Sequence, residues 1–411
     1  MGNMAEQMPK MLMGKELEEA MVSLPPYDPQ ICNADAATRL MALNDVAEIY
    51  IPSQMSYEIY SKIYLAMLHS LKKKQTVDAV RQGNQNHRRL QGLNYNSVLG
   101  GADSFSIIGP SGIGKSTALA KGIALSGGER IVTTNHPYAQ IIPCINVQCP
   151  HDCSVKGLLL EILSQVDMAI GTQYRQAATK YKASIDNIIG MVSQVSLNNI
   201  LLIVIDECQN ICRNKNGVNL VAAMTQLINS SGVSICMVGL PETEAFFRQE
   251  MQLARRSVGL SYSALPCNDY FIRFCETLFS YQYVAHPAIL TPEMIELLYE
   301  CTGGIIAVLV SVIMEAQQMA ILTGREELSK ETVLAAYQER LKNVQDFVKV
   351  RTAKRSQTSA SRGRCQMEIP ERRTETELDI TIAEMLEQAG EKDMDVAELL
   401  RGQGILVEEA V

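Results

Sequence analysis

The sequence lacks two features that would place the protein in or beyond a membrane. No apolar run reaches the roughly 20 residues that cross a bilayer. The first residues, Met-Gly-Asn-Met-Ala-Glu-Gln, do not show the charged-then-apolar order of a secretion signal. The eleven cysteines are scattered through segments with strand or helix patterns, which favours reduced thiols over a disulfide framework. We therefore expect a cytoplasmic protein without a membrane partner.

The chain also lacks a positive net charge, because 45 acidic residues outnumber 37 basic ones. The net charge of −8 argues against a protein that binds polyanions through its overall charge. The charges are unevenly distributed, however. Residues 351–373 are basic, whereas residues 375–411 hold eleven acidic residues and two basic ones. A local basic surface for nucleic acid therefore stays open.

A glycine-rich segment between an expected strand and an expected helix carries the clearest chemical signal. Residues 105–108 form a short apolar run, Gly-Pro-Ser-Gly-Ile-Gly-Lys-Ser follows at 109–116, and a helical pattern begins there. This is the phosphate-binding pattern G-x-x-x-x-G-K-S in the context that it requires. Glycines let backbone N–H groups approach a phosphate, and the helix N-terminus adds partial positive charge. The predicted nucleotide-binding residues are Gly109, Pro110, Ser111, Gly112, Ile113, Gly114, Lys115, Ser116 and Thr117.

The site also predicts roles for individual side chains. Lys115 is expected to reach the β- and γ-phosphates of ATP, and the Ser116 hydroxyl is expected to ligate Mg²⁺. Residues 200–205 contain no polar residue, which is typical of a central parallel strand covered on both faces. Asp206 and Glu207 follow at its carboxyl end. We predict that Asp206 holds Mg²⁺, mostly through water, and that Glu207 orients the water that attacks ATP.

The remaining patterns predict an α/β domain followed by helices. Alternating strands and helices favour a parallel sheet flanked by helices. Residues 84–89 are expected to be a polar connection. Further strands are expected at 141–147 and 233–238, and helices at 56–74, 155–170 and 175–195. Beyond residue 266 the strand signal stops, and helices are expected at 272–283, 292–301, 305–323 and 330–348.

Four segments follow from these patterns. Residues 1–54 are expected to form an N-terminal appendage, with partner docking as an open role, and residues 55–265 the nucleotide-binding core. Residues 266–348 are expected to form a small helical lid. Residues 349–411 are expected to be a flexible tail, in which a basic linker leads to an acidic, helix-patterned end. Such a tethered end is typical of a partner-binding tail.

Both motifs together, with a helical unit after the fifth strand, resemble the AAA+ ATPases. Residues 232–243 (Gly-Val-Ser-Ile-Cys-Met-Val-Gly-Leu-Pro-Glu-Thr), 252–256 (Gln-Leu-Ala-Arg-Arg) and 302–305 (Thr-Gly-Gly-Ile) are further similar to the TnsC/TniB transposition regulators. The resemblance implies an AAA+ P-loop core with ATP and Mg²⁺ as cofactors. It also implies an arginine that enters the neighbouring subunit's ATP site, where it stabilises charge on the transferring phosphoryl group. The matching residue is Arg255, with Arg256 beside it.

Two positions depart from the family pattern. A polar residue that senses the γ-phosphate is expected at the end of the fourth core strand, but Ser234 lies early in that strand and Thr243 lies beyond it. The arginine that often follows the Gly-Gly of the lid is replaced by Val308. Both departures imply slow hydrolysis, which suits a switch better than a motor.

The resemblance implies an ATP-dependent regulator of DNA transposition, a slow ATPase that DNA or partners stimulate. Its implied partners are duplex DNA, other copies of the chain in a ring or filament, a target-selection protein, and the transposase, which the tail would bind. Hydrolysis would disassemble it. DNA contacts are expected from the loop and helices after the second strand, although a solvated helix face also explains each of these charges. The candidates are Lys156, Arg175, Lys180 and Lys182.

Parts of the same sequence are compatible with other functions. An AAA+ nucleotide switch of the replication-loader or signalling type would use the same core. A protein-remodelling motor would need an aromatic pore loop, and residues 150–157 (Pro-His-Asp-Cys-Ser-Val-Lys-Gly) offer none. A zinc site is disfavoured because its ligand spacing is not a standard pattern and alternate strand residues point apart. Its ligands would be Cys144, Cys149, His151 and Cys153.

Overall fold

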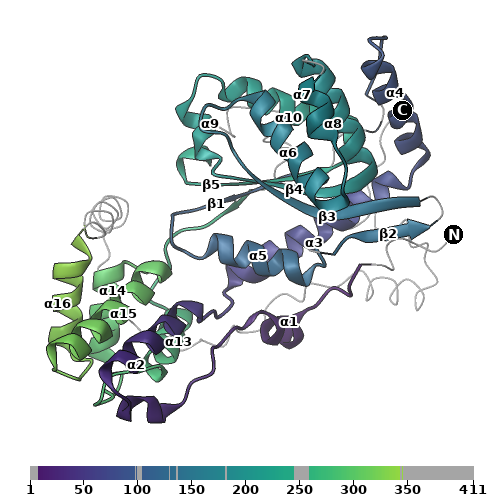
Figure 1. Ribbon diagram of the computed structural model, residues 1–411. Coiled ribbons are helices and arrows are strands. Elements are labelled where there is room, and N and C mark those ends of the chain that lie inside the picture. Colours follow the sequence, from purple (N-terminus) through teal and green to yellow (C-terminus); the bar gives the residue numbers. More distant parts are fainter. Residues whose placement is uncertain are drawn as a thin grey trace, which may run out of the picture. The chain divides into compact units, whose positions relative to one another are not determined.

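The strands of the computed structural model form one six-stranded sheet in the order β2-β3-β4-β5-β1-β6 (Figure 1). The structure describes residues 8–97, 99, 104–128, 130–135, 138–180, 183–244, 259–342 and 345, which fall within one compact unit. Along β3-β4-β5-β1-β6 every neighbouring pair is parallel, and β2 pairs antiparallel with β3. The strands are β1 (Phe105–Ile108), β2 (Val132–Asn135), β3 (Tyr138–Gln148), β4 (Ile200–Asp206), β5 (Ser234–Gly239) and β6 (Leu260–Ser261).

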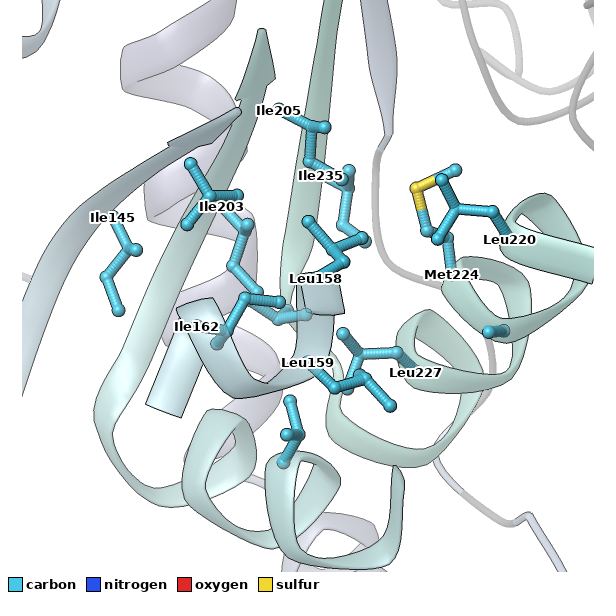
Figure 2. Close-up of a cluster of buried hydrophobic side chains, with 14 of the residues drawn as sticks. Ile145, Leu158, Leu159, Ile162, Ile203, Ile205, Leu220, Met224, Leu227 and Ile235 are labelled. Atoms are coloured by element: carbon cyan, nitrogen blue, oxygen red, sulfur yellow. The ribbon is translucent and has the colours of Figure 1, made fainter. Parts of the chain in front are cut away.

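The central strand β4 is covered on both faces. On one face Ile203 packs with Leu158 and Leu227 (Figure 2). On the other face Leu202 packs in a cluster with Ile63. A strand whose first six residues are all apolar therefore lies between two helical layers, which confirms the predicted α/β class. The covering helices are α6 (Val155–Ile170), α8 (Ile185–Asn199) and α10 (Gly217–Ser231) on the first face, and α3 (Gln54–Lys74) and α5 (Lys115–Leu125) on the second.

The helices after residue 266, the predicted lid, share one apolar core with residues 43–51 of the N-terminal segment. The central helix of the lid buries Leu309, Val312 and Ile313 completely. Among the described residues, helix α15 is long and apolar enough to cross a membrane by length and composition. This finding contradicts the expectation that the chain has no such apolar run. The burial of this helix against other lid helices is typical of a core helix. The lid helices are α13 (Asp269–Ser280), α14 (Pro292–Thr302), α15 (Ile306–Thr323) and α16 (Lys330–Arg340).

The N-terminal segment packs on both the core and the lid. Leu17 and Met21 cluster with Tyr60 of α3. Further along, Arg39 pairs with Glu326 of the lid, with Nη1 2.5 Å from Oε2 and Nη2 2.8 Å from Oε1. The segment therefore joins two parts of the fold that are distant in sequence. Its helices are α1 (Gly14–Met21), η2 (Pro29–Asn33), α2 (Ala36–Ala42) and η3 (Leu43–Glu48).

The expected polar connection at residues 84–89 is wrong, because these residues lie within helix α4 (Val77–Leu90). The buried face of this helix is polar. The Gln82 amide donates to Asn86 Oδ1 at 3.0 Å, and the Asn86 amide donates to the Ser230 carbonyl at 2.9 Å. A search for apolar periodicity therefore misses this helix, since hydrogen bonds hold its inner face.

Three further differences from the prediction concern one helix and two strands. The expected helix at 175–195 is two helices, α7 (Tyr174–Lys180) and α8, and the Ser184 hydroxyl caps the second by accepting from the Asn187 N–H at 3.2 Å. Strands β2 and β6 were not predicted. β6 pairs with only two residues of β1, and so short a strand carries no periodicity of its own.

Candidate nucleotide-binding site

The glycine-rich loop after β1 adopts a backbone that only glycine accepts easily. Gly112 and Gly114 have φ values of +79° and +94°. A Cβ on Gly112 would also lie 3.0 Å from Ile305 Cγ2 and 3.1 Å from Ala307 Cβ. Helix α5 begins directly at Lys115, so the loop ends at a helix N-terminus. The loop therefore has the shape of an anion cradle.

Lys115 lies folded over this loop. Its Nζ donates to the Gly109 carbonyl at 2.8 Å and to the Pro110 carbonyl at 2.7 Å, and the residue is 9% exposed. These two carbonyls hold the ammonium group next to the N-terminus of α5. A phosphate in the cradle would thus meet a cation whose position is already fixed.

The acidic pair lies at the carboxyl end of β4. Asp206 Oδ1 accepts from the Glu207 N–H at 2.7 Å, which orients the Asp206 carboxylate. Glu207 has a φ of +59°, an uncommon conformation for a residue other than glycine. Its Oε2 accepts from Gln209 Nε2. Gln209 is the first residue of α9 (Gln209–Arg213).

The predicted residues meet in one cavity of about 580 Å³, within the roughly 300–1,000 Å³ of small-molecule sites. Residues 111–117 and both acidic residues line it, whereas Gly109 and Pro110 stand behind it and hold Lys115 through their carbonyls. Sequence reasoning missed two walls of this cavity. One comes from the N-terminal segment and one from the lid; they are residues 47–51 and Tyr270, Phe274, Ile306, Ala307 and Val310.

The missed walls bring aromatic groups, one of which lies near a second cation, Lys121 of α5. Lys121 Nζ lies 5.0 Å from the centre of the Tyr50 ring, and desolvation lowers the pKa of Lys121. Tyr270 donates its hydroxyl to the Ile51 carbonyl at 2.9 Å, so a lid residue closes onto the N-terminal segment. Among the described residues that line the cavity, the basic ones are Lys115 and Lys121.

The lid also contacts the phosphate loop directly. The Ala307 N–H donates to the Gly112 carbonyl at 2.9 Å. Val308 is 8% exposed and belongs to the apolar core of the lid. The lid therefore reaches the loop through backbone and small side chains at the start of α15, without a basic residue there.

The two polar residues considered as γ-phosphate sensors do not line the cavity. The Ser234 hydroxyl donates to the Ala66 carbonyl at 3.0 Å, inside the packed sheet. Thr243 is buried, and its Oγ1 has no hydrogen-bond partner in the structure. Gly239 and Leu240, at the end of β5, form this part of the wall instead.

The residues of the cavity fit a magnesium nucleotide. A Cβ at Gly112 would press against Ile305 and Ala307, which favours glycine in the loop, and the buried Lys115 ammonium group lies beside the loop. The Ser116 and Asp206 oxygens line the same space, and Mg²⁺ prefers such oxygen ligands together with water and phosphate. Within the part of the chain that the structure describes, no cluster of three or more His, Cys, Asp or Glu side chains could hold a metal ion. That finding includes the region of Cys149, His151 and Cys153.

The DNA-binding candidates are not brought together. Lys156 is exposed at the start of α6, in a cleft of about 460 Å³ that Asn216 and Asn219 also line. Arg175 donates from Nη1 to Ser164 Oγ at 3.0 Å, about two turns further along α6. Lys180 is exposed at the end of α7. Lys182, Arg255, Arg256 and residues 349–411 lie outside the described residues.

A phosphate loop, a helix N-terminus and a strand-end acidic pair that share one cavity in a mainly parallel sheet define the P-loop ATPase class. Residues 69–262 match the family model described as bacterial TniB protein. This match confirms the resemblance to the TniB family of AAA+ ATPases that is seen in the sequence. No curated protein matches the chain.

Several solved structures are similar to the chain at low identity. The Aeropyrum pernix ORC1 protein in complex with DNA has 18% identity and a TM-score of 0.41, with 64% of each chain covered. The chain thus spans a little under two thirds of that protein. Cdc6p from Pyrobaculum aerophilum has 12% identity and a TM-score of 0.39, with 62% of this chain and 65% of that chain covered. The Thermotoga maritima RuvB Holliday junction branch migration motor has 11% identity and a TM-score of 0.36, with 81% and 89% covered.

Proposed function

We propose that the protein is an ATP-dependent regulator of DNA transposition. In this proposal it assembles on target duplex DNA, links a target-selection protein to the transposase, and disassembles when ATP is hydrolysed. The observation that supports it is a cavity whose phosphate loop and acidic pair both lie in the segment that matches the TniB family model.

The residues of the cavity have distinct roles in this proposal. Lys115 binds the β- and γ-phosphates, and the loop amides and the N-terminus of α5 offset the remaining negative charge. Ser116 and Asp206 hold Mg²⁺, which supplies charge neutralisation at the phosphates when bound. Glu207 accepts a hydrogen bond from the attacking water and orients it. The absence of a basic residue at the start of α15 favours slow turnover.

Arg255 is proposed to enter the ATP site of the neighbouring subunit, with Arg256 beside it. An arginine from a second copy would add positive charge at the γ-phosphate to that of Lys115 and Lys121, the basic residues among the described residues that line the cavity. ATP binding would then favour assembly, because each site is complete only between two subunits.

The cleft beside Lys156 is the proposed DNA contact. Lys156 is exposed there, and the amides of Asn216 and Asn219 can bind phosphate oxygens without adding charge. A single lysine per subunit binds DNA weakly, but an array of subunits repeats the contact along the duplex. Arg175 and Lys180 would contribute further along the same helical layer. The tail at 349–411 is proposed to bind the transposase.

Electron microscopy with ATP and a random duplex tests this function. We expect rings or filaments on the DNA with the wild-type protein, and neither assembly nor ATP binding with Lys115→Ala. Lys10→Ala is the matched control, because Lys10 is an exposed lysine remote from the cavity. Assemblies of Lys115→Ala on DNA would refute the coupling between ATP and assembly. A wild-type monomer that ignores DNA would favour a nucleotide switch of the replication-loader or signalling type.

A further inference from the structure

An apolar cavity lies at the far end of the helix that begins at the phosphate loop. Helix α5 runs from Lys115 to Leu125, a length of about 15 Å, and it lies beside α3 on one face of the sheet (Figure 1). The apolar cavity has a volume of about 360 Å³, within the roughly 300–1,000 Å³ of small-molecule sites. Among the described residues, none lines both this cavity and the nucleotide cavity. The two cavities are therefore separate sites.

The inner wall of the apolar cavity is made of buried side chains from three elements. They come from α3, β3 and β4, and they are Met67, Leu71, Ile141, Pro143 and Leu201. An apolar cavity offers a water molecule too few hydrogen-bond partners, so it binds apolar groups instead. The wall therefore selects a ligand with a hydrocarbon body.

The start of the described chain covers the apolar cavity and is held in place by α3. Met8 and Pro9 line the cavity. The Tyr64 hydroxyl donates to the Pro9 carbonyl at 2.9 Å, and the Tyr60 hydroxyl accepts from the Leu12 N–H at 2.8 Å. Two hydrogen bonds from one helix thus fix the cover, so the cavity is a formed site with a wall on each side.

Two polar side chains between α5 and β2 also line the apolar cavity. Ser126 is 1% exposed, and within the described part of the chain its Oγ has no hydrogen-bond partner. A buried hydroxyl in this state costs free energy, which an acceptor on a ligand would remove. Arg130 is exposed and brings a guanidinium, a group that binds a carboxylate through two parallel hydrogen bonds. A hydroxyl and a guanidinium next to an apolar wall suit the carboxylate end of an amphipathic molecule.

We propose that the apolar cavity binds a small amphipathic carboxylate, with its hydrocarbon chain against the buried wall and its carboxylate at Ser126 and Arg130. Such a ligand fills the apolar space and gives the Ser126 hydroxyl an acceptor. The guanidinium of Arg130 offsets the charge of the carboxylate. The inference does not rest on the proposed function, because the nucleotide cavity shares no described residue with this one.

Isothermal titration calorimetry of the full chain with decanoate, below the concentration at which it forms micelles, tests the site. We expect saturable binding of one decanoate per chain. Decanol has the same hydrocarbon chain without the charge and should bind about tenfold more weakly, since hydrogen bonds to a charged group are lost. Arg130→Gln should weaken decanoate binding about tenfold and change decanol binding less than about twofold. Arg81→Gln is the matched control, because Arg81 is an exposed arginine on α4.

A second pair of variants tests the location. Ala124 is exposed on α5 and lines the apolar cavity, so Ala124→Trp should abolish decanoate binding by filling the space. Ala37→Trp, at an exposed alanine in the first turn of α2, should bind decanoate as the wild type does. If Ala124→Trp is unstable in a thermal melt, Val132→Trp on β2 takes its place. Saturating ATP should leave the affinity for decanoate within about twofold.

Several results would overturn the inference. One is a wild-type chain without saturable decanoate binding. Another is equal affinity for decanoate and decanol, with no effect of Arg130→Gln on either. Unchanged binding in Ala124→Trp and Val132→Trp, or displacement of decanoate by ATP, would place the ligand elsewhere. Decanoate binding only in a variant that lacks residues 1–7 would identify that segment as the occupant of the cavity. None of these results bears on the proposed function, which the assemblies on DNA test separately.

Discussion

Replacing Arg39 with methionine should destabilise the fold and separate the N-terminal segment from the lid. Arg39 is 5% exposed, and its guanidinium donates to the Tyr283 carbonyl at 3.1 Å and forms the paired hydrogen bonds to Glu326. Methionine keeps most of the apolar stem of arginine and removes its charge. The substitution therefore changes the packing little, and its effect on the free energy of unfolding comes mainly from the lost charge.

The magnitude follows from the pKa of Glu326. Hydrogen bonds from Arg39, and then from the Ala285 N–H, lower this pKa from the usual 4.5 to about 2 against the effect of desolvation. Such a shift corresponds to about 3.4 kcal/mol at about 1.4 kcal/mol per pKa unit. The Glu326 side chain is 21% exposed, so water takes over part of the interaction when the arginine is lost. We therefore expect Arg39→Met to cost about 2 kcal/mol in the free energy of unfolding.

The sign of the pH dependence is also fixed. Because the pKa of Glu326 is lowered by folding, the stabilisation is fully present above about pH 4.5 and is lost as the pH falls toward about 2. Urea unfolding followed by circular dichroism measures the free energy of unfolding of wild type and Arg39→Met. The difference between the two free energies should be constant from about pH 7 to pH 5 and should become smaller below about pH 4.5.

An exposed pair provides the control. Arg81 lies 3.0 Å from Asp78, with side chains 66% and 52% exposed, and Arg81→Met should cost less than about 0.5 kcal/mol. The reasoning would be refuted if the two variants lost the same free energy of unfolding. It would also be refuted if the loss for Arg39→Met stayed constant down to low pH. Because residues 47–51 line the nucleotide cavity, Arg39→Met should also weaken ATP binding, whereas Arg81→Met should not.

Three further predictions concern the site and the tail. Glu207→Gln should bind ATP but hydrolyse it poorly, which leaves persistent assemblies on DNA; rapid phosphate release would show that another group orients the water. Gly112→Ala should weaken ATP binding measured by fluorescence titration, because its Cβ would meet Ile305 and Ala307 at 3.0 and 3.1 Å, whereas Gly171→Ala, with φ +70° and open space around it, should not. Deletion after Val350 should leave ATPase activity intact and reduce transposase capture in a pull-down assay; undiminished capture would remove the proposed role of the tail.

The phosphate-binding half of the site could be predicted because its requirements are local. The loop needs glycine where φ is positive, as at Gly112 and Gly114, and the lysine must open the following helix. β4 could be predicted because a strand buried on both faces leaves a continuous apolar run in the sequence. Helix α4 could not be predicted in this way, since Gln82 and Asn86 hold its buried face through hydrogen bonds.

By itself, the sequence determined the P-loop class, the acidic pair and the helical lid, because each depends on neighbouring residues and on a regular period. Only the tertiary structure decided what closes the cavity and what touches Glu207. Tyr50 and Tyr270 line it from segments that lie far apart in the sequence. The contacts of Arg39 with Glu326 and of Asn210 with Cys149 join residues with no common pattern. Such pairings follow from how the folded layers meet, which no local period encodes.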